Sequence, residues 1–303
     1  MSTRSVGIGL AFVAATISGF AIFVNSYAVK HFDDATVYTT AKNGVAGVLL
    51  ILLASVASRP GAHHEARRFP TTARGQGALV AVAVVGGSVP FVLFFEGLAR
   101  ASATQAAFIQ KTLVVWVALL AVPLLGERLR PAHVAAIVLL VAGQAALVGD
   151  AGTIAFGSGE AMILAATLLW SLEVVLAKWL LRSLAPSLLA AARLGLGTII
   201  LLGYVLLSGR WDELAGLSGS QWEWALLTGV ILTGYVSTWY AALARAPAVD
   251  VTAVLVFGAI VTAVLDAGFR SVPLDLLGVV LITVGVALVS RIAVRPRPAP
   301  APA

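Results

Sequence analysis

The sequence contains few charged residues and no cysteine. Only 11% of its 303 residues are Asp, Glu, Lys or Arg, whereas 60% are hydrophobic. A soluble globular protein carries roughly 25% charged residues because its surface must be hydrated, so the soluble classes are excluded. The absence of cysteine excludes disulfide bonds, thiolate catalysis and thiolate metal sites. The apolar residues are spread along the whole chain, which indicates an integral membrane protein.

The basic residues do not form a nucleic-acid-binding surface. They outnumber the acidic residues by twenty to fourteen, but they stand singly or in pairs between apolar runs. The sequence also lacks a phosphate-binding glycine-rich loop and the common zinc-protease and serine-hydrolase motifs. We therefore expect neither ATP-driven transport nor an intramembrane enzyme, and no catalytic residue, metal site or cofactor is predicted.

Ten segments are apolar enough to cross a membrane as helices, because one span needs about 20 apolar residues. Short separators rich in glycine, proline and charge divide them, as at Arg59-Pro60-Gly61. The predicted fold class is an all-α integral membrane protein. The predicted spans are 5–28, 36–57, 76–98, 103–124, 131–149, 157–178, 186–208, 221–243, 248–268 and 273–293.

The lysine and arginine residues of the loops are distributed unequally between the two membrane surfaces. Thirteen lie on the side of the N-terminus, four on the opposite side, and the remaining three of the twenty inside spans. Because cytoplasmic loops carry the excess of positive charge, both termini are predicted to be cytoplasmic, in a protein of the inner or plasma membrane. The four on the opposite side are Lys30, Arg100, Arg210 and Arg270.

The chain repeats itself once. The aligned positions are Lys42 with Arg193, 97–101 (Gly-Leu-Ala-Arg-Ala) with 242–246 (Ala-Leu-Ala-Arg-Ala), Pro131 with Pro273, and Gly143 with Gly285. Each repeat contains five helices, an odd number, so the second copy enters the membrane upside down. Inverted repeats are typical of secondary transporters, whose substrate site lies near the midplane between the halves. The predicted domains are a first repeat at 1–150, a second repeat at 151–295 and a disordered cytoplasmic tail at 296–303.

The end of the fourth span carries a resemblance to a known family. The stretch from Trp116 to Pro131 ends in Gly126-Glu127-Arg128-Leu129 and is followed by a glycine-containing span. It resembles the EamA-like members of the drug/metabolite transporter superfamily. The resemblance implies two inverted five-helix repeats, cytoplasmic termini, a central cavity lined mainly by spans 1, 3, 4, 6, 8 and 9, and transport, often export, of small metabolites such as amino acids.

Two charged residues lie deep inside predicted spans, where a charge is costly unless it faces a cavity or a partner. Lys111 lies about eight residues, or ~12 Å, into the fourth span and shares a small, polar helix face with Thr104. Glu173 lies in the sixth span, one turn after Trp170. We predict that Lys111 attracts a substrate carboxylate and that Glu173 carries a coupling proton or binds a substrate amine. The alternative for both is an ion pair that only holds helices together.

Deep aromatic residues predict the rest of the binding site, because a small-molecule pocket is mostly apolar with a few polar groups. The alternative for these residues is anchoring at the membrane surface, where Trp and Tyr are enriched. The predicted lining consists of Phe94, Trp116, Trp170, Tyr235 and Trp239, with Ser18 and Asn25 as hydrogen-bonding groups.

Lys42 and Arg193 lie only a turn or two inside their spans, so we expect both to snorkel to the surface and to have a structural role. Glu127 and Arg128 are expected to cap the end of the fourth span.

Glycine and proline interrupt the third and eighth spans. Gly86, Gly87 and Pro90 lie in the third span, and Gly234 lies in the eighth. Because proline removes a backbone hydrogen bond and kinks a helix, these positions are predicted hinges of a gate. The alternative is that the glycines serve close helix packing.

These features predict a secondary transporter that works by alternating access. A deep lysine disfavours purely cationic substrates, so we expect the export of amino acids or related zwitterions or anions. The alternative is efflux of hydrophobic cationic drugs, with the aromatic wall dominating; an intramembrane enzyme or a channel is less favoured. The expected partners are a small-molecule substrate and the lipid bilayer, and ten helices suffice for a self-contained monomer.

Overall fold

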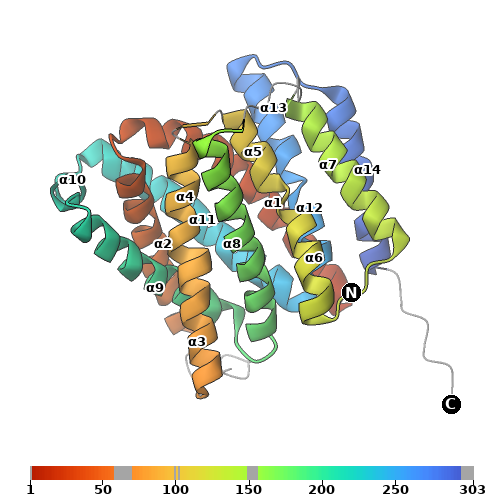
Figure 1. Ribbon diagram of the computed structural model, residues 1–303, viewed down its shortest axis with the longest axis horizontal. Coiled ribbons are helices and arrows are strands. Elements are labelled where there is room, and N and C mark those ends of the chain that lie inside the picture. Colours follow the sequence, from red (N-terminus) through yellow and green to blue (C-terminus); the bar gives the residue numbers. More distant parts are fainter. Residues whose placement is uncertain (1, 58–69, 99, 102, 149–155, 295–303) are drawn as a thin grey trace.

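A computed structural model describes residues 2–57, 70–98, 100–101, 103–148 and 156–294 of the protein, and every regular element in these ranges is a helix (Figure 1). The first half contains α1 (Thr3–Ala28), η1 (Val29–His31), α2 (Ala35–Ala57), α3 (Ala73–Val82), η2 (Ala83–Ser88), α4 (Val89–Leu98), α5 (Ala103–Lys111), α6 (Leu113–Leu125) and α7 (Pro131–Val148). The second half contains α8 (Ser158–Leu180), α9 (Pro186–Leu207), α10 (Trp211–Ala215), α11 (Gly219–Arg245), α12 (Ala248–Leu255), α13 (Gly258–Arg270) and α14 (Leu276–Val294).

The all-helical membrane fold is confirmed. In the described ranges, nine helices are long and apolar enough to cross a membrane, and α7 is a shorter apolar helix. The sequence did not predict α10, a short exposed helix in the predicted loop before α11. The predicted disordered tail at 296–303 lies outside the described residues.

Three spans are interrupted rather than continuous. The third span changes from α3 into the π-helix η2 and back into α4 just before Pro90. The fourth breaks at Thr112, where the N–H of Val115 bonds to the Thr112 carbonyl at 2.8 Å, a tight three-residue turn. The ninth span breaks in the same way at Phe257, whose N–H bonds to the Val254 carbonyl at 3.0 Å. The register of the repeat aligns Thr112 with Phe257, so both copies have the same break.

The helices pack with the two-fold symmetry of an inverted repeat. Helix α2 packs against α9, its own counterpart, and α7 packs against α14 in the same way. The contact between α1 and α11 has its equivalent in the contact between α8 and α4. Helix α1 begins and α14 ends at one end of the bundle, which we call the terminal side (Figure 1).

Glycine allows α9 to approach η2 closely, and α14 to approach α7 in the same way. A Cβ atom built on Gly197 of α9 would lie 2.6 Å from the Gly87 carbonyl oxygen, and one on Gly278 of α14 would lie 2.8 Å from that of Gly143 in α7. Contact between small residues replaces the hydrophobic effect as a source of helix association in lipid.

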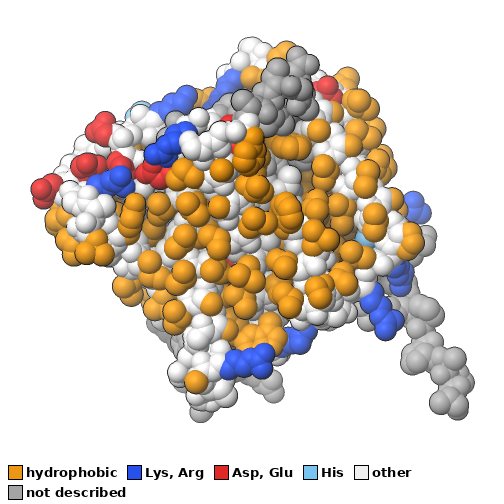
Figure 2. Space-filling view, in the orientation of Figure 1, with side chains coloured by type: hydrophobic (Ala, Val, Ile, Leu, Met, Phe, Trp, Pro, Cys, Tyr) orange, Lys and Arg blue, Asp and Glu red, His pale blue; other side chains and the backbone are white. Residues whose placement is uncertain are grey.

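The outer surface matches a lipid environment. Hydrophobic side chains cover the middle of the face seen in Figure 2, and charged side chains gather towards its two ends. Large apolar residues that a soluble protein would bury are exposed here, such as Val48, Leu52 and Ile199.

Candidate functional site

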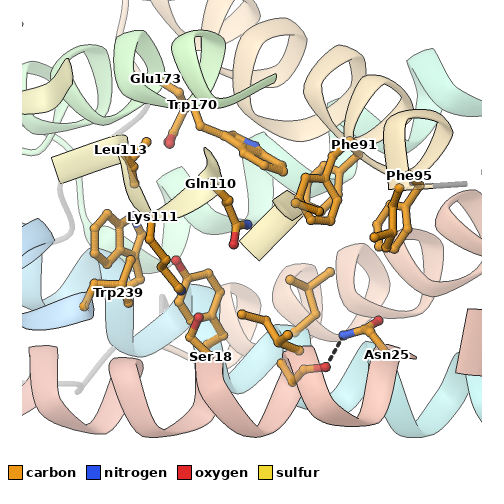
Figure 3. Close-up of a pocket in the computed structure, with 18 of the residues that line it drawn as sticks. Ser18, Asn25, Phe91, Phe95, Gln110, Lys111, Leu113, Trp170, Glu173 and Trp239 are labelled. Atoms are coloured by element: carbon orange, nitrogen blue, oxygen red, sulfur yellow. Dashed lines mark hydrogen bonds between the residues drawn. The ribbon is translucent and has the colours of Figure 1, made fainter. Parts of the chain in front are cut away.

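A cavity of about 200 Å³ lies between the two repeats (Figure 3). It is lined by α1, α4, α5, α6, α8, α11 and α12, with one cation each from α2 and α9. Its charged lining residues are Lys42, Lys111, Glu173 and Arg193, and its aromatic lining residues are Phe91, Phe94, Phe95, Trp170, Tyr235 and Trp239.

The cavity extends towards the end of the bundle opposite the terminal side. Ser26 and Leu98 line it, and both lie at the ends of their helices that point away from the terminal side. Its deepest lining residues, Val174, Trp239 and Thr252, lie one to two turns from the terminal ends of α8, α11 and α12.

Lys111 brings a positive charge to this cavity. It is the last residue of α5, directly before the break at Thr112, and its side chain points towards the cavity beside Trp239 (Figure 3). The residue is only 7% exposed, and no described residue forms an ion pair or hydrogen bond with its ammonium group. A buried cation without a protein counter-ion favours an anionic group of a ligand.

The carbonyl oxygen of Gly86 organises one wall. In an α-helix this oxygen would accept a bond from the N–H of residue 90, but Pro90 has no N–H. Arg193 Nη2 donates to it instead at 3.0 Å, and Trp170 Nε1 donates at 3.3 Å. Pro90 thus leaves free an acceptor that holds a cation from α9 and an indole from α8.

Glu173 is surrounded by donors. Its Oε1 accepts a 2.5 Å hydrogen bond from the Tyr240 hydroxyl, and its Oε2 lies 3.9 Å from Arg193 Nη2. All three residues are buried. Of the two partners that the structural alternative allows, Lys111 or a residue of a neighbouring helix, Glu173 pairs with the second, Arg193 of α9.

Lys42 is held by aromatic rings. Its Nζ lies 4.3 Å from the centre of the Phe95 ring and 4.9 Å from that of Tyr38, and it donates to Asn25 Oδ1 at 3.3 Å. Phe91 lies between the two repeat-related cations, 5.6 Å from Lys42 Nζ and 6.0 Å from Arg193 Cζ. Cation–π contacts lower the cost of burying a charge but do not neutralise it.

The structure places most of the other predicted residues at the cavity. Trp170 packs edge-on against Phe91, with ring centres 5.5 Å apart, and Tyr235 stacks on Trp239 at 6.1 Å. Phe94 lies 5.5 Å from Trp170. Ser18 and Asn25 also line the cavity; the dashed line in Figure 3 is the 2.6 Å bond from Asn25 Nδ2 to the Ala21 carbonyl.

Two predicted residues are not part of the described lining. Trp116 lies away from it, because its Nε1 donates back to Thr112 Oγ1 at 3.1 Å along its own helix. The side chain of Thr104 lies outside the described part of the structure.

The prediction that Lys42 and Arg193 snorkel to the surface is wrong. Lys42 is 3% exposed and Arg193 is 5% exposed, and both line the cavity. The signal that the sequence offered was the repeat itself, which places a cation at the same position of both copies. Gln110 was also missed; it lines the cavity, and its Oε1 has no hydrogen-bond partner among the described residues.

Side-chain contacts close the bundle on the terminal side. The Glu127 side chain accepts from the N–H groups of Ala248 at 2.6 Å and Val249 at 3.0 Å, the first residues of α12. Its backbone N–H bonds to the Ala121 carbonyl at 3.2 Å and caps the end of α6, as the sequence predicts. Asp250 of α12 pairs with Arg4 at 2.5 Å, and its Oδ1 lies 3.3 Å from His133 Nε2. These contacts tie α12 to α1, α6 and α7.

The predicted hinge positions differ in their surroundings. Gly86 packs against the Glu173 and Arg193 side chains, and Gly87 packs against the backbone of α9, so both have a packing role. A Cβ atom on Gly234 would meet only Ile17, at 3.8 Å. The hinge hypothesis remains a prediction for Gly86, Gly87, Pro90 and Gly234.

An apolar bundle of two inverted repeats, closed at one end around a largely aromatic cavity that contains a few charged groups, defines a multi-pass membrane transporter. The sequence model of the EamA-like transporter family matches the chain twice, at residues 5–149 and 157–291. The chain therefore belongs to the EamA-like transporter family, within the drug/metabolite transporter superfamily.

A comparison with solved structures supports the same fold. A solved structure described only as a crystal structure of a protein matches with a TM-score of 0.76 and 20% sequence identity, covering 95% of this chain and 99% of that one. At this identity the likeness shows the fold alone. No curated protein matches the sequence.

Proposed function

We propose that this protein is a secondary transporter that exports small carboxylate-bearing metabolites, amino acids or related zwitterions and anions, by alternating access. The substrate is held between the two repeats, with its carboxylate at Lys111. Phe94, Trp170, Tyr235 and Trp239 surround its apolar part, and Ser18 and Asn25 supply hydrogen bonds.

The observation that carries this proposal is the buried ammonium group of Lys111, which faces the cavity without a described counter-ion. The size of the cavity supports a small metabolite, since about 200 Å³ is below the range of ~300–1,000 Å³ that is usual for drug-sized ligands. The excess of loop cations on the terminal side supports cytoplasmic termini in the inner or plasma membrane.

A second candidate function is the efflux of hydrophobic cations, favoured by the six aromatic residues of the lining. It would use Glu173 as the counter-ion. The ion pair of Glu173 with Arg193 disfavours this role, because the carboxylate already has a cationic partner. Proton coupling through Glu173 is the remaining role that we assign to this residue as a hypothesis.

Counterflow in proteoliposomes tests the proposal. Labelled amino acids, organic anions and cationic dyes are offered to wild type, to Lys111→Ala and to a control, Lys30→Ala, which removes an exposed lysine outside the cavity. We expect carboxylate-bearing compounds to accumulate with wild type and the control but not with Lys111→Ala. Accumulation of cationic dyes alone, with Lys111→Ala unaffected, would support the second function instead.

A further inference from the structure

We infer that the substrate is a small dianion, and specifically an aliphatic dicarboxylate whose two carboxylates are bound by Lys42 and Lys111. This inference rests on the proposed function and narrows its substrate class. It comes from the charge of the cavity and from the positions of the two lysines within it.

The charges of the lining residues do not cancel. Among the described residues that line the cavity, Lys42, Lys111 and Arg193 are cationic and Glu173 is anionic. Glu173 and Arg193 pair with each other, which leaves the two lysines. Neither lysine forms an ion pair with a described residue, and Lys42 has one hydrogen bond, to the neutral Asn25. Two uncompensated cations in a low-dielectric site are matched by an occupant with two negative charges.

The two lysines lie in different parts of the cavity. Lys42 Nζ is within 3.3 Å of Asn25 Oδ1 and 4.3 Å of the Phe95 ring, whereas Lys111 is beside Trp239. Figure 3 shows Asn25 and Phe95 at one end of the cavity and Trp239 at the other. A ligand that reaches both cations therefore carries its acidic groups at its two ends.

The wall between these ends suits a hydrocarbon chain with a central polar group. Ile22, Phe94 and Leu232 line the cavity and offer apolar contact. Gln110 also lines it and points inward, with an amide oxygen that has no partner among the described residues (Figure 3). A hydroxyl group on the chain of a dicarboxylate would supply the missing donor.

The test is counterflow of labelled succinate, malate, butyrate and alanine by the full-length protein in proteoliposomes. We expect wild type to exchange the two dicarboxylates in preference to butyrate and alanine. Lys42→Gln and Lys111→Gln should each weaken dicarboxylate transport about 10- to 100-fold, the loss expected for one charge-assisted hydrogen bond. Lys42→Gln should change butyrate transport much less, because the single carboxylate of butyrate is bound at Lys111. Lys42→Arg should restore the preference in part, and the exposed Lys30→Gln should leave it unchanged.

The outcomes separate this inference from the proposed function. The dianion site is wrong if butyrate or alanine exchanges at the same rate as the dicarboxylates, or if Lys42→Gln lowers the transport of all compounds equally. In either case the proposed function, transport of carboxylate-bearing metabolites, still stands. If no carboxylate-bearing compound exchanges, both are wrong. Should a lysine variant fail to fold, the wild-type protein alone gives the same decision. Unlabelled succinate should then inhibit the transport of labelled succinate more strongly than unlabelled butyrate does.

Discussion

Replacing Glu173 by Gln tests whether this carboxylate keeps Arg193 in place in the wall of the cavity. The substitution removes the charge 3.9 Å from Arg193 Nη2 but retains an oxygen that accepts the hydrogen bond from Tyr240. Arg193 keeps its 3.0 Å bond to the Gly86 carbonyl and its contact with the Phe91 ring. The variant therefore isolates the electrostatic part of the Glu173–Arg193 contact.

The expected loss of stability lies between two reference values. Removing one partner of a buried ion pair typically costs ~3–5 kcal/mol, because the other charge remains unpaired. Polar contacts between membrane helices average only ~0.6 kcal/mol and reach ~1.7 kcal/mol. Because the separation is long and Arg193 keeps another acceptor, we expect Glu173→Gln to lower the free energy of unfolding by about 1–2 kcal/mol, near the upper end of the membrane values.

The assay is a double-mutant cycle of Glu173→Gln and Arg193→Gln, with the free energy of unfolding measured by denaturant titration in detergent micelles. We expect the double variant to be less destabilised than the sum of the two single variants, by about 0.5–1.5 kcal/mol. A coupling energy of zero would refute the ion-pair role. Loss of pH-gradient-driven transport in Glu173→Gln without any loss of stability would identify Glu173 as a proton carrier instead.

Further predictions concern the free carbonyl, the closed end and the orientation. Pro90→Ala supplies an N–H that competes for the Gly86 carbonyl, so transport should slow about 2- to 10-fold while the unfolding free energy rises; transport at the wild-type rate would exclude this role of the carbonyl. Asp250→Asn weakens the closure at the terminal side, and thiol labelling of Thr252→Cys from that side should rise about tenfold; an unchanged labelling rate would show that Asp250 does not close it. An impermeant thiol reagent should label Lys30→Cys from outside cells and Arg245→Cys only after lysis, and the reverse pattern would invert the proposed orientation.

The sequence predicts the spans, the duplication and much of the cavity, because these depend on apolar length and on the recurrence of motifs. The sequence indicates Lys111, Trp170 and Glu173 as site residues because a polar or aromatic group deep in a span needs a cavity or a partner. The same reasoning, applied to Lys42 and Arg193, gave the wrong location. Depth along a helix is readable from the sequence, but the direction in which its side chains face depends on the partner helix. Helices α2 and α9 pack against each other and turn both cations inward.

Local geometry accounts for the remaining differences. Trp116 lies five residues after Lys111, about 140° further round a helix, so the two side chains face different directions even without the turn at Thr112. The sequence lacks a proline there that would signal the break. The Glu127 N–H caps its own helix, as the sequence predicts. The partners of its side chain on α12 follow from the way the two repeats meet, which a one-dimensional pattern does not contain.

The central claim is that substrate binds between the two repeats through Lys111. Because the natural chain has no cysteine, Ser18→Cys places a single thiol in the cavity wall. The measurement is the labelling rate of this thiol with and without a saturating carboxylate substrate, in the wild-type and Lys111→Ala backgrounds. We predict that substrate slows labelling in the wild-type background and has no effect in the Lys111→Ala background. The claim would be contradicted if Ser18→Cys, with Lys111 intact, still transports the substrate but is labelled at the same rate with and without it.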